Sequence, residues 1–133
     1  MTCFRMIDVT CAIIIKDNKI LVTQRSEKMK LPLKWEFPGG KIEKDETPEN
    51  CLLRELREEL NIEVRIVKKL TNNIHDYGSF EINLIPFIVT YISGEITLSE
   101  HAAYLFLDRS QLGNMDWAEA DLPILQEFIK SEL

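Results

Sequence analysis

Three glutamates in the middle of the chain could together bind a divalent cation. Glu55, Glu58 and Glu59 occupy positions i, i+3 and i+4 of a segment with helical spacing, so their side chains share one face. Like charges on one face repel each other, and an isolated helix gains nothing from them. A hard cation such as Mg²⁺ would change the sign of that interaction, because it binds carboxylate oxygens and keeps several waters. The alternative is a solvated acidic helix face, the commonest explanation of a run of charges.

The segment that carries these glutamates has helix signals at both ends. Thr47 suits the N-cap, and Pro48 suits the first helical position, where its missing N–H does no harm. Asn61 follows the last turn, where a left-handed residue is usual and Asn is second only to Gly. The opposite side carries apolar residues at helical spacing, namely Cys51, Leu52, Leu56 and Leu60. A glycine turn at Gly39-Gly40 and a short acidic loop lead into this helix.

This arrangement resembles the Nudix box, the signature of the Nudix hydrolases. The pattern is Gly, five residues, Glu, seven residues, Arg-Glu, an aliphatic residue, any residue, Glu-Glu, any residue, Gly and an aliphatic residue. The chain has at these positions Gly40, Glu46, Arg54-Glu55, Leu56, Glu58-Glu59, Asn61 and Ile62. Asn in place of the last glycine is the one departure, and Asn tolerates the left-handed conformation needed there.

The resemblance implies a fold and a chemistry. The fold would be α/β, a mixed β-sheet sandwiched between helices. Nudix enzymes hydrolyse a nucleoside diphosphate linked to another group, with metal ions that neutralise the phosphates and activate a water. Mg²⁺ is the expected ion, and Mn²⁺ is an alternative. The ligands would be the carboxylates of Glu55, Glu58 and Glu59, joined by the backbone carbonyl of Gly39.

The resemblance also assigns roles around the metal. Glu55 could act as the general base, and the planar fork of Arg54 could hold a box carboxylate by two hydrogen bonds. Glu46 would tie the acidic loop to the helix. Glu100 stands in a later loop and could serve as a ligand or a base, or it could be an ordinary exposed glutamate. Neither its neighbour His101 nor His75, also in a loop, is assigned a role.

Three further segments narrow the resemblance to the MutT-like nucleoside triphosphate pyrophosphohydrolases, nearest their CTP pyrophosphohydrolase branch. They are Gln24-Arg25 with residues 33–40, Glu100-His101 with the strand that ends at Leu107, and residues 117–123. Members of that branch act on (d)CTP and oxidised pyrimidine nucleotides. The implied reaction converts a nucleoside triphosphate and water to the monophosphate and pyrophosphate, with attack at the β-phosphorus.

Four residues are candidates for contacts with the nucleotide, and each has a plainer alternative. Arg25 could bind a phosphate or the ribose, and Lys41 could meet a phosphate or be solvated. Phe37 could stack on the base or belong to the core, whereas Trp35 is expected to pack. Asp121 could accept a hydrogen bond from the exocyclic amine of cytosine, or it could cap the last helix. MutT-like relatives read the base with an asparagine at that position, so an aspartate argues against 8-oxoguanine.

Several other functions stay open at this point. One is hydrolysis of 8-oxo-dGTP, and another is hydrolysis of a different nucleoside diphosphate derivative, such as a nucleotide sugar, a dinucleotide or capped RNA. Outside catalysis, the chain could be a Nudix-fold binding module, or a structural subunit whose acidic face meets a basic partner. Turnover that depends on magnesium would exclude the binding module.

Length, charge and cysteine content restrict the domain organisation, the possible partners and the compartment of the protein. A chain of 133 residues suits a single domain, residues 1–133. The formal net charge of −6 argues against binding to a nucleic-acid polymer or an anionic membrane, although a metal could still bring in a small nucleotide. Cys3, Cys11 and Cys51 are odd in number and lack metal-ligand spacing, which favours free thiols in the cytoplasm. No signal peptide or membrane span is expected, and the chain could be a monomer or a homodimer.

The elements that must position these residues follow from the apolar pattern. Strands are expected at residues 6–16, 20–24, 63–70, 80–92, 95–98 and 104–107. Pro86 implies that the fourth of these is an edge strand or has a bulge. Residues 71–79 are expected to form a polar loop. A helical turn is expected near residues 109–112 and a last helix over residues 120–133, with Pro123 in its first turn.

Overall fold

The computed structural model describes residues 6–131, and its centre is a mixed sheet of eight strands. The strands are β1 (Met6–Lys16), β2 (Lys19–Gln24), β3 (Trp35–Glu36), β4 (Gly39–Lys41), β5 (Glu63–Lys69), β6 (Asn73–Asp76), β7 (Glu81–Ser93) and β8 (Ala103–Leu107). The helices are α1 (Pro48–Leu60) and α2 (Leu122–Lys130), and 3₁₀ turns cover Arg109–Asn114 and Glu119–Asp121. Strands β1 and β7 run parallel, and the other pairings are antiparallel.

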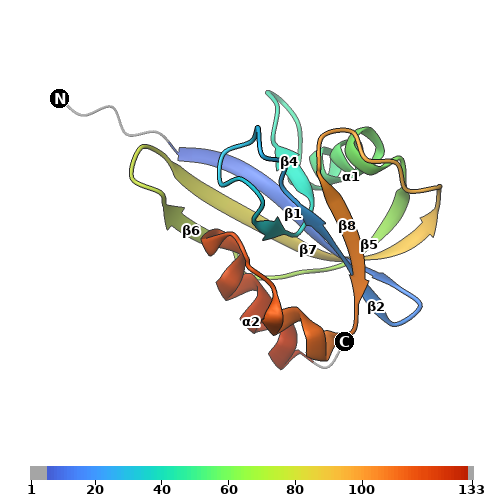
Figure 1. Cartoon of the computed structure of the whole chain (residues 1–133). Coiled ribbons are helices and arrows are strands. Elements are labelled where there is room, and N and C mark those ends of the chain that lie inside the picture. Colours follow the sequence, from blue (N-terminus) through green and yellow to red (C-terminus); the bar gives the residue numbers. More distant parts are fainter. Residues whose placement is uncertain (1–5, 132–133) are drawn as a thin grey trace.

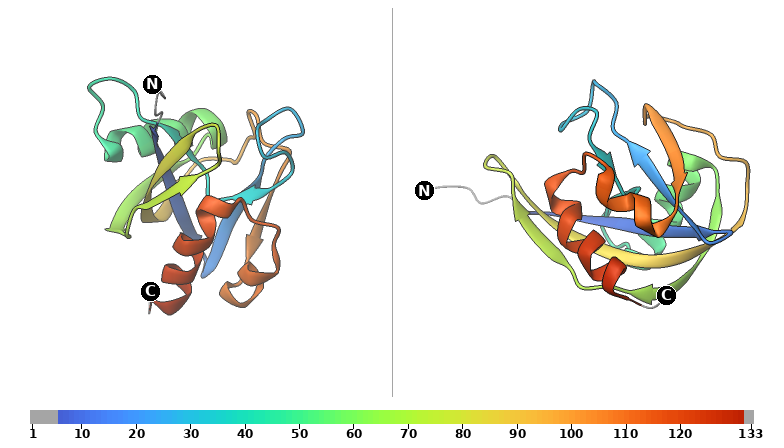
Figure 2. Two further views of the ribbon diagram at one scale, coloured as in Figure 1. Left: turned by 90° about the vertical axis from the view of Figure 1, so that its left-hand side faces the viewer. Right: turned by 60° about the horizontal axis from the view of Figure 1, so that its bottom comes forward.

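The two helices cover opposite faces of the sheet (Figures 1 and 2). Successive residues of a strand point to opposite faces, and β1 shows this alternation clearly. Ala12 and Ile14 face a core that α1 completes, with Leu52, Leu56 and Leu60. Cys11 and Ile13 face a second core that α2 completes, with Ile124, Leu125 and Phe128. The predicted α/β fold, a sheet between helices, is confirmed.

Helix α1 begins and ends as the sequence predicts. The Thr47 hydroxyl accepts a hydrogen bond from the Asn50 backbone N–H at 3.1 Å, and Pro48 opens the helix. Asn61 has φ 61° and ψ 37°, a left-handed conformation, and its N–H reaches back to the Arg57 carbonyl. Asn therefore fills the position at which the box pattern has glycine.

Pro86 is predicted to mark an edge strand or a bulge. The edge alternative is wrong because β7 lies inside the sheet, and the β5–β7 register does shift, between Ile66 and Lys68 opposite Val89 and Ile88. β7 has β1 on one side, and on the other side β5 and then β6. Pro86 sits where β5 has ended and β6 has not begun, and its carbonyl accepts the Leu70 N–H at 3.0 Å. The N–H and C=O of one strand residue point to the same neighbour, so the missing proline N–H faces this gap and leaves the pairing with β1 intact.

Four local predictions need correction. Gly39-Gly40 forms part of strand β4, paired with Thr10 and Cys11 of β1, and is no turn. Residues 95–98 form a loop, and residues 73–76 of the predicted polar loop form strand β6. The last helix begins at Leu122 after a 3₁₀ turn and ends at Lys130. The end of its predicted span, residues 132–133, lies outside the described residues, as does Cys3.

The helices of the described chain are short. Within residues 6–131, none has the length and the apolar composition that crossing a bilayer requires.

Candidate active site

One cavity of about 420 Å³ gathers most of the predicted site residues. It lies between the N-terminal part of β1, helix α1 and the turn before α2. Its lining includes Arg25, Phe37, Gly39, Lys41, Glu55, Glu59, Glu100 and Asp121. Arg54 and Glu58, the other two predicted residues, stand beside the lining. This volume is in the range of small-molecule binding sites, so a ligand there need not be a polymer.

The two glycines before the acidic loop are required by close contacts and not by a turn. A Cβ on Gly40 would lie 2.2 Å from the carboxylate carbon of Glu55. A Cβ on Gly39 would lie 2.0 Å from the Thr10 carbonyl oxygen, inside the β1–β4 pairing. The absence of a side chain at Gly40 therefore leaves room for the Glu55 carboxylate. The absence of a side chain at Gly39 allows β4 to pair with β1.

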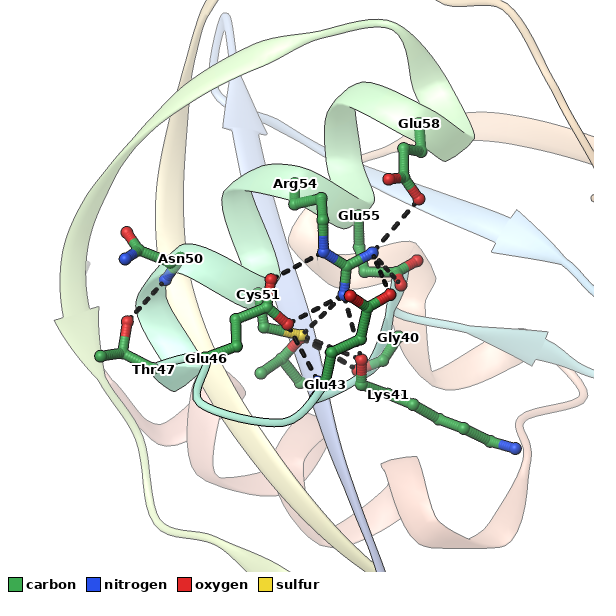
Figure 3. Close-up of polar contacts among 11 residues, drawn as sticks. Gly40, Lys41, Glu43, Glu46, Thr47, Asn50, Cys51, Arg54, Glu55 and Glu58 are labelled. Carbon is green, nitrogen blue, oxygen red and sulfur yellow. Dashed lines mark hydrogen bonds and ion pairs between the residues drawn. The ribbon is translucent and has the colours of Figure 1, made fainter.

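Arg54 connects the acidic loop to the carboxylates of α1 (Figure 3). Its Nε and Nη2 donate to the two oxygens of Glu46 at 2.7 and 2.9 Å, a bidentate contact. Its Nη1 donates to Glu55 at 2.9 Å and to Glu58 at 3.2 Å. The hydrogen bonds from Arg54 lower the pKa of Glu46 to about 2. Arg54 thus holds Glu46 of the box by two hydrogen bonds, which anchors the loop, and also contacts Glu55 and Glu58.

Glu55 and Glu59 face the cavity from surroundings that disfavour their charge. Burial raises the pKa of Glu55, and the neighbouring Arg54 partly offsets the effect. Burial also raises the pKa of Glu59, with further contributions from the charges of Glu100 and Glu55. The Glu59 Oε2 atom is buried and has no hydrogen-bond partner among the described residues. Glu58 differs, since its side chain is 58% exposed and turns toward Arg54.

These carboxylates fit a hard divalent cation that is shared with a substrate. The donors are oxygens, and the Glu59 oxygen without a partner would gain one from a cation. Within residues 6–131, no three Asp, Glu, His or Cys side chains form a ready-made cage for a metal. Mg²⁺ is usually held by one or two carboxylates together with phosphate oxygens and water, so a complete protein cage is not required.

A chain of polar side chains, partly buried at Arg25 and Glu36 and buried at His101, also lines the cavity. Arg25 Nη1 donates to Glu36 Oε1 at 2.7 Å, and His101 Nε2 contacts Glu36 Oε2 at 2.8 Å. The sequence analysis assigned no role to either Glu36 or His101. Glu36 and His101 are separated by 65 positions, so no local pattern signals their contact. The one signal for His101 in the sequence was its position directly after Glu100, a predicted site residue.

Asp121 is nearly buried and turned toward the cavity. Asp121 occupies the N-cap position of α2, as the helix-cap alternative expected, but its side chain makes no capping hydrogen bond to the helix. Its Oδ2 accepts the Phe37 backbone N–H at 2.8 Å, and Oδ1 makes no hydrogen bond in the described structure. Burial raises the pKa of Asp121 well above its usual range, and the charge of Glu36 adds to the effect.

Some aromatic residues near the cavity belong to the hydrophobic core, and others form the wall of the cavity. Phe37 is buried and packs on Trp117 with 4.7 Å between ring centroids, so most of its ring belongs to the core. Trp35 packs against the same core, as predicted. Tyr77 and Phe80, which the sequence analysis did not single out, stack in the cavity wall at 5.4 Å. Lys41 is exposed, and its ammonium extends away from the Arg54 contacts (Figure 3).

Comparisons with known proteins agree with this geometry. A family model described as the NUDIX domain matches residues 5–128. A CTP pyrophosphohydrolase of Escherichia coli (strain K12) is 35% identical over 125 residues, covering 94% of this chain and 93% of that protein. An 8-oxo-dGTP diphosphatase of Proteus vulgaris is 44% identical over 82 residues, covering 62% of this chain and 73% of that protein. The solution structure of a MutT protein from methicillin-resistant Staphylococcus aureus 252 has a TM-score of 0.78 at 41% identity, covering 96% of this chain and 98% of that one.

Proposed function

Because this chain belongs to the Nudix hydrolase family, we propose that it hydrolyses a nucleoside triphosphate to the monophosphate and pyrophosphate, with a divalent cation as cofactor. The observation that carries the proposal is one cavity whose lining combines the carboxylates of Glu55 and Glu59 with the buried Asp121. We assign Glu55 and Glu59 to the phosphate end of a bound nucleotide and Asp121 to its base end. Such a cavity can hold the phosphates and the base of one nucleotide at the same time.

The residues at the acidic end have distinct proposed tasks. A cation bound there would supply positive charge for the phosphates and lower the pKa of a bound water. Glu58 and Glu59, with the Gly39 carbonyl, are the proposed ligands, and Glu100 is a further ligand or base. Glu55 is a ligand that could also accept the proton of the attacking water. Arg54 keeps Glu55 in place and does not itself reach the cavity.

The residues at the other end are proposed to bind the nucleoside. The Asp121 Oδ1 atom can accept a hydrogen bond from the exocyclic amine of cytosine, because it has no partner in the described structure. Arg25 is proposed to contact a phosphate or the ribose, and Lys41 a phosphate. For Phe37, only the edge of the ring at the cavity is available to the base. (d)CTP or an oxidised pyrimidine nucleotide is therefore the proposed substrate, in agreement with the name of the Escherichia coli relative.

Hydrolysis of 8-oxo-dGTP is a second candidate, and a specific observation favours it. An ionised Asp121 would only accept hydrogen bonds, unlike the asparagine that reads the base in MutT-like relatives. Burial raises the pKa of this carboxyl, and a protonated carboxyl carries one donor as well as acceptors, like the amide of asparagine. The Proteus vulgaris relative is named for this activity.

A nucleotide panel tests the proposal directly. The purified protein is incubated with CTP, dCTP, 8-oxo-dGTP, dGTP and UDP-glucose, in Mg²⁺, in Mn²⁺ and in EDTA, and the products are separated. We expect a monophosphate and pyrophosphate from a triphosphate, and no turnover in EDTA. Release of orthophosphate would contradict the reaction, and faster hydrolysis of UDP-glucose would contradict the substrate class. Absence of turnover throughout the panel would favour a binding module.

The position of attack can be read from an isotope label. In water enriched in ¹⁸O, attack at the β-phosphorus places the label in pyrophosphate, because the oxygen between the α- and β-phosphorus leaves with the monophosphate. Attack at the α-phosphorus would instead label the monophosphate. We expect the label in pyrophosphate.

We place the reaction in a reducing compartment such as the cytoplasm. Cys11 and Cys51 are buried free thiols in the described chain, which suits such a compartment. The proposed partner is a small nucleotide, and the protein could act as a monomer or a homodimer.

A further inference from the structure

We propose that His101 is a positioning residue, which fixes the loop that carries Glu100 and, through Glu36, aligns Arg25. This inference rests on the proposed function, because it concerns the placement of groups in that cavity. It gives a role to a histidine that sequence patterns left without one. The burial of His101, the carboxylate of Glu36 that it shares with Arg25 and the backbone anchors of the Glu100 loop all point to this role.

His101 is buried beside an exposed glutamate. Its side chain is 3% exposed, whereas Glu100, one residue earlier, is exposed. An ionised carboxylate only accepts hydrogen bonds, so the His101 Nε2–H donates to Glu36. The Nδ1 atom is buried without a partner among the described residues. Among the described residues, the hydrogen bond to Glu36 is therefore the polar contact of the His101 ring, and it fixes the orientation of that ring.

Glu36 uses both of its oxygens to join two parts of the molecule. One oxygen contacts His101 at 2.8 Å and the other contacts Arg25 at 2.7 Å. The Arg25 Nε donates to the Lys30 carbonyl, so the guanidinium is held on two sides. If the histidine contact is lost, Glu36 is free to rotate, and the Arg25 guanidinium loses a fixed partner.

The loop between β7 and β8 is anchored at both ends, with Glu100 between the anchors. On one side, the Ser99 N–H donates to the Glu59 carbonyl of α1 at 3.1 Å. On the other side, the Ala102 N–H donates to the Gln24 carbonyl of β2 at 2.9 Å. Both anchors are backbone contacts, and His101 supplies the side-chain anchor next to Glu100. The position of the Glu100 carboxylate over the cavity thus depends on where the histidine ring lies.

The location of His101 argues for more than packing. His101, Glu36 and Arg25 all line the cavity, together with Glu59 and Glu100. One contact between a histidine and a glutamate therefore controls a group at each end of the proposed nucleotide. We expect its loss to lower kcat, through Glu100, and to raise KM, through Arg25.

Two similar substitutions separate the hydrogen bond from the side chain itself. In His101→Gln, the amide nitrogen can reach about as far as Nε2 and can still donate to Glu36. In His101→Asn, the amide falls short of Glu36. We expect kcat/KM of His101→Asn to fall by about 10- to 100-fold, the range seen when supporting hydrogen bonds of a site are removed. We expect His101→Gln to stay within about threefold of the unmodified protein, well inside that range.

A second histidine provides the matched control. His75 contacts Glu119 at 3.0 Å, but it lies outside the cavity lining and is 26% exposed. His75→Asn breaks the same kind of contact, and we expect it to leave kcat and KM unchanged. Equal kinetics of His101→Asn and the unmodified protein would overturn the proposal. Equal losses in His101→Gln and His101→Asn would also overturn it, because the bond to Glu36 would then be irrelevant.

A binding measurement without metal keeps the proposal testable apart from turnover. In EDTA, calorimetry with CMP reports on the binding of the nucleoside and its one phosphate without a metal, and we expect weaker binding to His101→Asn than to His101→Gln. Equal CMP affinities of the two variants would contradict the link to Arg25. If His101→Asn does not fold, Glu36→Gln replaces it, since its amide NH₂, a donor, would face either Arg25 or His101, each of which needs an acceptor there. An unmodified protein that hydrolyses no triphosphate would refute the proposed function, whereas an active protein indifferent to these substitutions would refute this inference alone.

Discussion

Glu55 and Glu59 share one face of α1, but their partners differ. Glu55 is held by Arg54, whereas Glu59 has an oxygen without a partner and faces the charge of Glu100. A carboxylate that is already held is suited to orient a water or to accept its proton. A carboxylate without a cationic partner is suited to bind a cation directly. The difference in surroundings therefore separates the proposed tasks of the two residues.

Glu59→Gln is expected to remove activity without removing the fold. The substitution keeps the shape of the side chain but removes the charge proposed to bind the cation, and we expect kcat to fall by about 100-fold or more. Because it also relieves repulsion with Glu100 and Glu55, Tm should stay the same or rise. Steady-state kinetics and thermal unfolding check the two expectations. Glu49→Gln, at an exposed position of the same helix, is the control. A fully active Glu59→Gln would contradict the ligand assignment.

The two glycines should respond differently to a single added methyl group. Gly39→Ala places a Cβ against the backbone of Thr10, which cannot move cheaply, so we expect a loss of stability of about 1–3 kcal/mol or more. Gly40→Ala places a Cβ against the Glu55 carboxylate, the end of a flexible side chain. We expect a smaller loss of stability there but a large loss of kcat. Urea unfolding and kinetics measure both, with Gly113→Ala as the control, since nothing lies within 4 Å of its Cβ. The reverse order of effects would contradict this explanation.

Part of the site could be predicted at the residue level, for a physical reason. Glu55, Glu59 and Arg54 lie on one helix, so their spacing in the sequence fixes their spacing in the structure. Glu36, His101 and Tyr77 come from separate strands and loops, and only the folded sheet brings them to the cavity. The raised pKa of Asp121 likewise depends on burial, which a local pattern does not show.

At the level of elements, the acidic loop and α1 are joined by the ion pair between Glu46 and Arg54, whose contribution to stability depends on pH. Arg54 lowers the folded-state pKa of Glu46 from 4.5 to about 2. A carboxyl whose pKa is lowered by folding stabilises the folded state while ionised. Its contribution is complete above pH about 4.5 and is lost as the pH falls toward about 2.

The expected result is a difference in acid stability between the protein and Glu46→Gln. Tm of the unmodified protein should fall more steeply between pH 4.5 and 2 than Tm of Glu46→Gln, because the variant has no such proton to take up. Thermal unfolding by circular dichroism at a series of pH values measures this. Glu27→Gln, an exposed loop position, should follow the unmodified curve. Parallel curves for the protein and Glu46→Gln would show that the ion pair does not stabilise the fold.

The two segments that were predicted wrongly, residues 73–76 and 95–98, are those whose conformation is decided by contacts with distant parts of the chain. Residues 73–76 are polar except for Ile74, and β6 forms because the part of β7 before Pro86, residues 81–84, needs a hydrogen-bonding partner. Residues 95–98 have the composition of a strand, but the N–H groups of Thr97 and Ser99 bond to the carbonyl groups of Leu60 and Glu59 at the end of α1. Helix α1 was predictable because its caps and its apolar stripe are local.

The whole molecule has one sheet with a core on each face, and the strands belong to both cores. Ala12 and Ile14 of β1 pack in the core on the α1 side, while Ile13, between them, packs on the α2 side. Loss of packing on one face should therefore loosen the strand that supports the other face. Cooperative unfolding of the two cores follows from this arrangement.

The single-domain prediction can be tested by truncating one core at a time. Leu56→Ala on α1 and Leu125→Ala on α2 should each lower the free energy of unfolding by about 2–5 kcal/mol. Tryptophan fluorescence and far-UV circular dichroism should give coincident urea transitions in both variants. Leu122→Ala, at an exposed position of α2, should change the free energy by less than about 0.5 kcal/mol. Separate transitions for the two probes would refute a single domain.

The two ends of the cavity are encoded in separate stretches of the chain. Residues 39–62 supply the acidic end, whereas residues 25–37 and 117–121 supply most of the other end. Selection on substrate range and selection on the hydrolytic step can therefore act on different parts of one gene. A library randomised only at the second set of positions, with Arg25 and Glu36 kept, should yield descendants with new nucleoside preferences that inherit the same phosphate chemistry.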